Sequence, residues 1–172
     1  MDDLPSMLKK IGDNHFRENS GLCYDDFIVG STIDSDHGRT ITEADCMWLT
    51  LLLGIETPVH INKDYASKTE FKEVIVEQAV VFGITVGLHS RLISGAAVVN
   101  LEFDEIKALL PVKINDTLYV SSEVVSKRDL KSRPTQGLVV IKMITKNQKG
   151  EVVLTSTRTM IVWKKASRPI DD

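Results

Sequence analysis

The sequence predicts an α+β domain in which one buried helix precedes an antiparallel sheet that wraps around it. Two observations predict this class: apolar residues recur at helical spacing from Thr42 onward, and their period changes to two after Gly95. The chain has 172 residues, a length that suits one domain with its own core. We divide it into an N-terminal arm over 1–20, a domain over 21–166 and a C-terminal tail over 167–172.

Composition narrows the class of protein. With 42% hydrophobic and 26% charged residues and a net charge of −3, the chain has no basic excess for nucleic acid or an anionic membrane surface. The 2 cysteines form no spaced framework, which suits a reducing cytoplasm. The start lacks the features of a signal peptide, and the longest apolar stretch, 74–88, is too short to span a bilayer. The Cys, His and acidic residues show no metal-ligand spacing.

Before the central helix, the pattern predicts a loose arm or short helix over 1–20 and a short strand or turn over 24–29. Thr42 and Asp45 have the spacing of a capping box, which predicts a helix start there. The apolar residues of this helix then fall on one face: Ala44, Trp48, Leu51 and Leu52. Gly54 ends the helix, and a loop over 55–61 leads to a short helix over 62–68 capped by Asn62.

The segment 76–92 predicts the central helix, because it is apolar on nearly every side and such helices are buried. Gly83 and Gly87 each cost about 1 kcal/mol of helix propensity relative to alanine. Their spacing places both on one face, where a sheet or a slender ligand could approach the backbone. His89, late in this helix, is interpreted as a core histidine.

Four segments rich in Val, Ile and Thr predict the sheet: 98–106, 117–126, 138–146 and 152–164. Turn residues separate them, including Lys131-Ser132-Arg133-Pro134 and Asn147-Gln148-Lys149-Gly150. The last turn has a glycine where a hairpin needs positive φ. We therefore expect at least four antiparallel strands after the central helix.

Several blocks resemble the MaoC-like dehydratase family, also called the (R)-specific enoyl-CoA hydratases. The family hallmark is Gly-Asp-x-Asn-Pro-aliphatic-His, followed by Tyr/Phe-Ala. This chain has Gly54-Ile55-Glu56-Thr57-Pro58-Val59-His60, then Asp64-Tyr65-Ala66. The resemblance covers about 24–164 and includes Asp116-Thr117-Leu118-Tyr119, the 131–134 turn and 147–153. Within the family, the chain is most similar to the itaconyl-CoA and mesaconyl-CoA hydratase branch.

The resemblance implies a hotdog fold with sites at a dimer interface. We therefore expect a homodimer or a higher even oligomer with His60 near the interface. It implies hydration of an enoyl-CoA, in which an Asp and a His hold one water and a helix-start N–H polarises the thioester carbonyl. The partner would be an acyl-CoA, and no separate cofactor is implied because CoA belongs to the substrate.

The chain departs from the family at the decisive position, because Ile55 stands where the catalytic Asp is expected. His60 is the candidate acid/base, with a packing histidine as the alternative. Glu56 is the candidate helper from the same loop, or a solvated loop residue. Glu77 is a second candidate base, or a cap of the central helix.

Further residues are candidates for substrate binding. The helix-start amides of Gln78 and Ala79 are candidate donors to the carbonyl. Lys131 and Arg133, with Lys127 and Arg128 in the same basic cluster, could contact CoA phosphates or form a solvated turn.

Three functions remain open at this point. The first is an acyl-CoA hydratase or dehydratase that relies on His60. The second is a non-catalytic thioester-binding hotdog subunit, which the loss of the Asp favours. The third is a hotdog thioesterase that uses Glu77.

Overall fold

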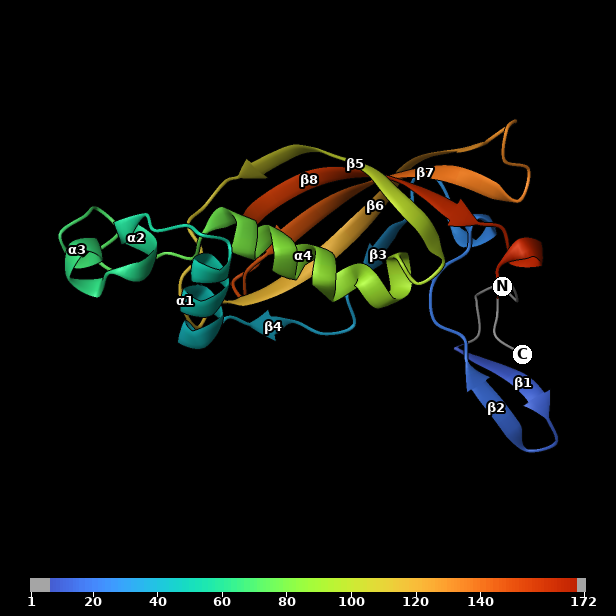
Figure 1. Cartoon of the computed structure of the whole chain (residues 1–172), viewed down its shortest axis with the longest axis horizontal. Coiled ribbons are helices and arrows are strands. Elements are labelled where there is room, and N and C mark those ends of the chain that lie inside the picture. Colours follow the sequence, from blue (N-terminus) through green and yellow to red (C-terminus); the bar gives the residue numbers. More distant parts are fainter. Residues whose placement is uncertain (1–6, 170–172) are drawn as a thin grey trace.

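The computed structural model describes residues 7–169, and its main feature is a sheet that curves over one long helix (Figure 1). The strands pair in the order β3-β6-β7-β8-β5, all antiparallel, and β4 also pairs with β6. The strands are β3 (Thr32–Asp34), β4 (Arg39–Thr40), β5 (Ala97–Ala108), β6 (Thr117–Asp129), β7 (Gln136–Lys146) and β8 (Val152–Trp163). The predicted α+β class and the four strands after the central helix are confirmed.

The central helix α4 (Gln78–Ile93) confirms the predicted buried helix. Glu77 caps its first turn, and Val81, Ile84 and Ile93 are among the side chains that it buries. Two apolar clusters lie along it. The cluster at its N-terminal end contains Val81 and Ile84, and the cluster at its C-terminal end contains Ile93 and Phe27. The helix therefore joins both halves of the core.

Three short helices precede α4 and extend from one end of the molecule (Figure 1). They are α1 (Glu43–Leu52), α2 (Pro58–Ile61) and α3 (Lys63–Ser67). The predicted caps are present: the Thr42 hydroxyl accepts a hydrogen bond from the Asp45 amide, and the Asn62 side chain accepts one from the Tyr65 amide. The prediction of a continuous loop over 55–61 is wrong, because proline at the first helical position starts the single turn α2.

The orientation of α1 differs from that of an ordinary amphipathic helix. The face predicted from the sequence faces outward, and its large side chains are exposed: Trp48 56%, Leu51 53% and Leu52 71%. Cys46 and Thr50 are the buried residues of this helix. The apolar stripe of α1 therefore has no cover within residues 7–169.

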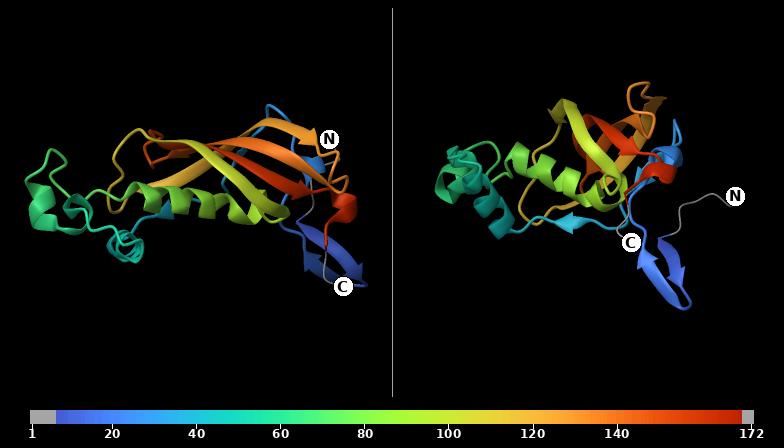
Figure 2. Two further views of the ribbon diagram at one scale, coloured as in Figure 1. Left: turned by 45° about the horizontal axis from the view of Figure 1, so that its top comes forward. Right: turned by 45° about the vertical axis from the view of Figure 1, so that its right-hand side comes forward.

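The N-terminal arm forms a hairpin of β1 (Leu8–Gly12) and β2 (His15–Glu18) rather than a loose segment or a helix. Asn14 adopts φ 54 at its turn, a conformation that asparagine tolerates well. The hairpin projects from the body in both views of Figure 2, and Arg91 on α4 pairs with Glu18. The predicted arm over 1–20 lies partly outside the described residues, as does the tail over 167–172.

The remaining differences concern short elements. The segment predicted as a strand or turn is the 3-10 turn η1 (Tyr24–Asp26), and a second one, η2 (Lys165–Ser167), follows β8. The pattern did not predict β3 and β4, which contain three and two residues. Within residues 7–169, no helix combines the length and apolar character needed to cross a membrane.

Candidate active site

His60 is positioned by the short helices that precede α4. It lies in α2, which starts at Pro58, and the Cys46 thiol of α1 lies 3.7 Å from the His60 carbonyl oxygen. The backbone of this turn is also closed by a hydrogen bond from the Asn62 amide to the Pro58 carbonyl. The histidine is half-buried, so water and a ligand can reach its ring.

One hydrogen bond fixes the tautomer of His60. Its Nδ1 lies 2.8 Å from the carbonyl oxygen of Ile75. A carbonyl oxygen can only accept, so Nδ1 carries the proton in the neutral ring and Nε2 keeps its lone pair. A general base requires this arrangement, because the bond at Nδ1 orients the ring while Nε2 can accept a proton.

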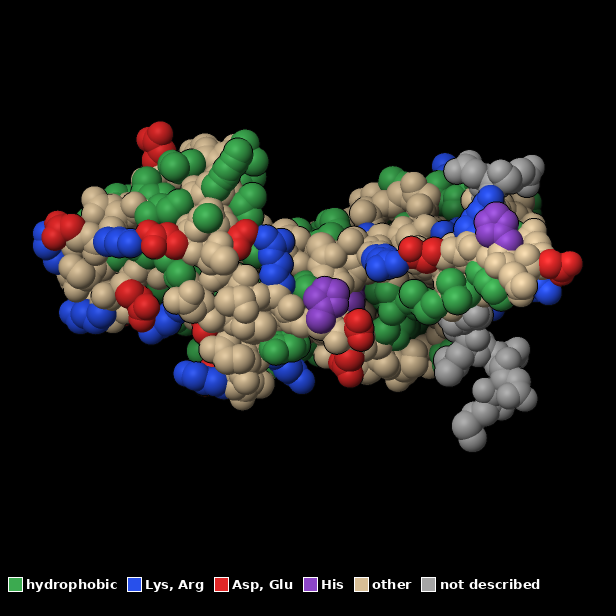
Figure 3. Space-filling model, turned by 90° about the horizontal axis from the view of Figure 1, so that it is seen from below, with side chains coloured by type: hydrophobic (Ala, Val, Ile, Leu, Met, Phe, Trp, Pro, Cys, Tyr) green, Lys and Arg blue, Asp and Glu red, His purple; other side chains and the backbone are tan. Residues whose placement is uncertain are grey.

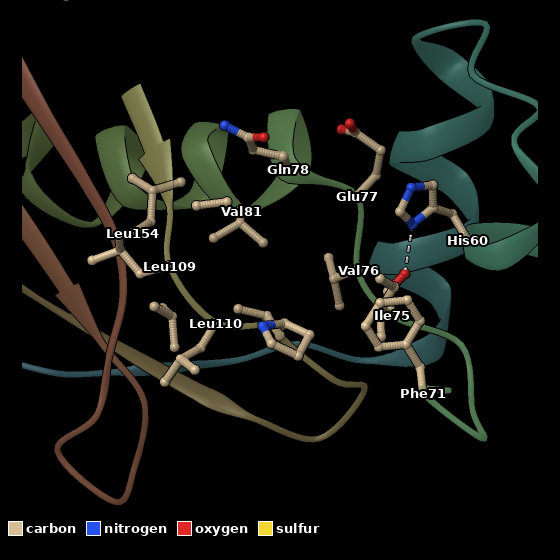
Figure 4. Close-up of a pocket in the computed structure, with 14 residues that line it drawn as sticks. His60, Phe71, Ile75, Val76, Glu77, Gln78, Val81, Leu109, Leu110 and Leu154 are labelled. Carbon is tan, nitrogen blue, oxygen red and sulfur yellow. Dashed lines mark hydrogen bonds between the residues drawn. The ribbon is translucent and has the colours of Figure 1, made fainter. Parts of the chain in front are cut away.

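The pocket beside His60 has a volume of about 410 Å³ and is mainly apolar (Figure 4). His60, Glu77 and Gln78 supply its polar side chains. The apolar lining is Phe71, Ile75, Val76, Val81, Ala108, Leu109, Leu110, Pro111, Val112, Val153 and Leu154. The sheet and the loop after β5 thus form the wall opposite α4. A pocket of this kind can enclose an apolar group and place a few polar atoms at one end of it.

The N-terminal end of α4 supplies the polar end of the pocket. The Glu77 carboxylate accepts a hydrogen bond from the Ala79 amide, which is the cap that the sequence offered as one role. The Val80 and Val81 amides donate to the Glu77 carbonyl. Among residues 7–169 the Gln78 amide has no acceptor, and it lies at the positive end of the helix dipole beside the pocket.

The other candidate residues near His60 differ in whether they line its pocket. Gln78 lines the pocket, whereas Ala79 lines a second groove on another side of α4. Glu56 is exposed and is not part of the pocket lining. Ile55 is half-buried, and its amide donates to the Thr50 carbonyl at 3.1 Å. The carboxylate of the described pocket lining is that of Glu77, and Figure 4 shows Glu77 and His60 at the same end of the pocket.

Lys131 and Arg133 lie at the opposite end of the sheet. Their turn precedes β7 at Gln136, while Thr145, near the other end of β7, pairs with the pocket residue Leu154. Nine residues of strand separate the two ends, which corresponds to about 30 Å at about 3.3 Å per residue. Within one chain these basic residues and His60 are therefore not brought together.

Sequence reasoning missed the groups that orient and enclose His60. The Ile75 carbonyl has no sequence signature, because every residue carries one. Phe71 lines the pocket from the loop before α4, and its position depends on how that loop folds. In the part of the chain that is described, no cluster of His, Cys, Asp or Glu could hold a metal ion.

Comparisons with known proteins agree with this architecture. The model of the MaoC-like domain family matches residues 26–147. A β-methylmalyl-CoA dehydratase of Chloroflexus aurantiacus is 31% identical over 149 residues, which cover 87% of this chain and 42% of that protein. A mesaconyl-CoA hydratase of Cereibacter sphaeroides is 27% identical, covering 87% and 43%. The chain thus spans less than half the length of these relatives.

Solved structures show the same fold. A putative MaoC domain dehydratase from Chloroflexus aurantiacus superposes with a TM-score of 0.81 at 28% identity, over 88% of this chain and 45% of that one. A Mycobacterium tuberculosis protein described as a double hotdog fold superposes with a TM-score of 0.78 at 19% identity, over 88% and 47%. The fold is therefore a hotdog fold, as expected. Because the family model covers well over half of its residues, the chain belongs to the MaoC-like domain family.

Proposed function

We propose that the pocket at the start of α4 binds an unsaturated acyl-CoA and catalyses reversible addition of water to its double bond. The observation that carries this proposal is the orientation of His60. Its Nδ1 is held by the Ile75 carbonyl, which leaves Nε2 to act on a water beside an apolar pocket. The relatives named as a dehydratase and a hydratase of CoA esters support the same reaction class.

In the proposed reaction, His60 serves both as base and as acid. Its Nε2 takes a proton from water while the water oxygen forms a bond to the β-carbon of the enoyl group. The π electrons move toward the thioester carbonyl, whose developing negative charge is stabilised by the Gln78 amide and the helix dipole. The imidazolium then returns its proton to the α-carbon, so that one water is added overall. CoA enters as part of the substrate, and the scheme uses no separate cofactor.

The missing aspartate makes this a single-histidine mechanism in which Glu77 has a supporting role. Its carboxylate is engaged with the Ala79 amide, so it stabilises the first turn of α4 beside the reacting carbonyl. Glu56 is exposed outside the pocket lining, so it has no part in the scheme.

We further propose that a homodimer completes the substrate site. The outer edge of β5 has no strand partner among residues 7–169, and it exposes Val99 43% and Leu101 53%. An unpaired edge of this length is prone to pair with another strand. If the β5 strands of two copies paired antiparallel about a two-fold axis, the end of the partner sheet that lies away from its own pocket would come close to His60. This pairing would move Lys131 and Arg133 of the second copy toward the pocket, where they can contact CoA phosphates.

One alternative is favoured by a specific observation. Ile55 occupies the family position of the catalytic Asp and cannot transfer a proton. In that alternative the chain binds acyl thioesters in the same pocket without converting them. Thioester hydrolysis is a third outcome, in which Glu77 would leave its capping contact and act as the base.

The test is incubation of the purified protein with a panel of enoyl-CoA and 3-hydroxyacyl-CoA compounds, followed by mass analysis of the CoA esters. Hydration adds the mass of one water to the intact ester, and dehydration removes it. Hydrolysis releases free CoA. A panel in which every compound is unchanged, while several bind, would favour the binding subunit.

A further inference from the structure

The loop between β5 and β6 packs against the segment that orients His60. Ile75 and Lys113 face each other as an antiparallel bridge, and the Val76 amide donates to the Val112 carbonyl at 2.8 Å. Ile75 and Val76 line the pocket of His60 (Figure 4), and Val112 lines it from the opposite segment. The two segments therefore form one wall of the pocket, and the position of each depends on the other.

The hydrogen bonding of this bridge determines where its backbone groups point. The bond runs between the neighbouring residues, so Ile75 and Lys113 form a non-hydrogen-bonded pair whose own N–H and C=O groups point away from each other. On one side, the Ile75 carbonyl oxygen lies 2.8 Å from Nδ1 of His60. On the other side, the Lys113 amide donates to Oδ2 of Asp116 at 2.8 Å. The bridge is thus held between the candidate base and a carboxylate.

The Asp116 carboxylate uses both of its oxygens in this region. While Oδ2 accepts from the Lys113 amide, Oδ1 accepts from Nε2 of Gln148 at 2.8 Å. The other side-chain atom of Gln148, Oε1, accepts from the Thr117 amide at 2.9 Å. Asp116 is half-buried, so water competes less for these bonds than at an exposed residue. Asp116 and Gln148 belong to two separate blocks of the family resemblance, and the fold joins these blocks at one carboxylate.

The same two segments also carry an ion pair. Nζ of Lys113 lies 2.6 Å from Oε1 of Glu73, and both side chains are about half exposed. On the face seen in Figure 3, basic and acidic side chains lie side by side at the end of the molecule that carries the short helices. Exposed pairs of this kind contribute little, because water and salt screen them. The stronger restraint on Lys113 is therefore the charge-assisted bond from its amide to Asp116.

We propose that Asp116 is a positioning residue that keeps the His60 ring in the orientation required of a base. It holds the backbone of Lys113, which faces Ile75 across the bridge, and the Ile75 carbonyl orients the ring. Asp116 lies outside the described pocket lining, so it acts through these neighbours and not on the substrate. The effect on rate rests on the proposed function, whereas the effect on the orientation of His60 depends on no reaction.

The test uses two variants of the full chain and a matched control. Asp116→Ala removes both acceptor oxygens. The double variant Asp116→Asn with Gln148→Glu reverses the bond between the two side chains. Its asparagine keeps an oxygen for the Lys113 amide and donates to the glutamate, which still accepts from the backbone. The control is Asp25→Ala, because the Asp25 carboxylate also accepts a backbone amide from a distant segment, that of Lys165 at 2.8 Å, away from the pocket.

The first readout is the ¹⁵N spectrum of the His60 ring at about pH 8, where an unperturbed histidine is neutral. The signals are assigned by their absence from the His60→Ala protein. In the wild type, we expect the two well-separated signals of one tautomer, with the proton on Nδ1. Asp116→Ala should move both signals toward the intermediate positions of a tautomer mixture. The double variant and Asp25→Ala should keep the wild-type signals.

The second readout is the steady-state rate of hydration. Asp116→Ala should lower kcat by about tenfold or more and change KM by less than about twofold, because a misplaced acid/base group acts on the transition state. The double variant should return kcat to within about threefold of the wild type. A wild type that hydrates no ester would contradict the proposed function, and the ¹⁵N spectra would still decide the role of Asp116.

The inference is overturned if Asp116→Ala keeps the wild-type signals of His60, or if the double variant fails to restore them. It is also overturned if Asp116→Ala and Asp25→Ala change these signals equally, because the change would then reflect a general loss of stability.

Discussion

A histidine lies near each end of α4, His60 from α2 and His89 from α4 itself, and the two differ in burial and in surroundings. At the N-terminal end, His60 is half-buried, faces a pocket and has one nitrogen held by a backbone carbonyl. At the C-terminal end, His89 is 1% exposed, and its Nδ1 lies 2.7 Å from the Ser122 hydroxyl. Of the two, His60 is the one that lines a pocket, so we propose chemistry for the histidine at one end and packing for the histidine at the other.

The C-terminal end also buries a cation without an acidic partner among residues 7–169. Arg158 is 1% exposed, its Nε donates to Asn100 Oδ1 at 2.7 Å, and its Nη2 donates to Ser94 Oγ at 2.9 Å. The guanidinium also lies over the Phe103 ring at 5.4 Å. These contacts tie β8 to β5 and to the end of α4. The closed end therefore stabilises the frame, and the open end is where we propose the reaction.

The largest expected effect is at the open end. His60→Ala should lower the rate of hydration by about 10²- to 10⁴-fold, because it removes the acid/base group. Substrate affinity should change little, since the proton transfer occurs in the transition state. Steady-state kinetics measures both. His37→Ala is the matched control, an exposed histidine outside the pocket lining, and should keep the full rate.

At the closed end, the effect should be on stability. Asn100→Ala should lower the free energy of unfolding by about 2–4 kcal/mol, because it leaves a buried guanidinium short of acceptors. Arg158→Met should cost less, within about 1 kcal/mol, because it removes the charge together with its desolvation. Urea denaturation compares the two variants. If Arg158→Met lowered the free energy of unfolding more than Asn100→Ala does, the charge of Arg158 itself would stabilise the fold.

The buried histidine should make stability depend on pH. Burial, with a contribution from Arg158, holds the pKa of His89 below its ordinary value of 6.5. The unfolded chain therefore takes up a proton before the folded one does. The contribution of neutral His89 to the free energy of unfolding should be fully present above about pH 6.5. It should fall by at most about 1.4 kcal/mol per pH unit as the pH drops through the folded pKa. Urea denaturation at several pH values should show this slope, and His89→Gln should flatten it.

The smallest effect should come from Glu77, which caps α4 at the open end. Glu77→Gln keeps an acceptor oxygen for the Ala79 amide and removes only the charge, so it should cost less than about 1 kcal/mol. The hydration rate should stay within about tenfold of the wild type. A loss as large as that of His60→Ala would identify Glu77 as a catalytic base instead of a cap.

Much of the fold could be predicted from the sequence where local chemistry decides structure. The capping box at Thr42 and the apolar segment of α4 each correspond to an observed element. The direction of the α1 stripe could not be predicted, because periodicity shows which residues share a face and not what that face meets. Strands β3 and β4 were missed because they are too short for an alternating pattern and depend on pairing with β6.

For the site, the motif identified His60 and the start of α4, and both line one pocket. It could not identify the Ile75 carbonyl, since every residue has a backbone carbonyl and only the fold places this one beside His60. Lys131 was a candidate contact for CoA phosphates because of the basic cluster around it, and clustering in the sequence carries no information about distance from the pocket along the sheet. The role of this residue stays a prediction that depends on the dimer.

The central claim is that His60 works without an aspartate at position 55. The most direct measurement compares the wild-type chain and Ile55→Asp on one enoyl-CoA, with the mass of the intact CoA ester as the readout. We expect the wild type to add water on its own, with Ile55→Asp changing only the rate. If the wild type leaves the ester unchanged and Ile55→Asp hydrates it, the chain is a thioester-binding subunit and the single-histidine mechanism is wrong.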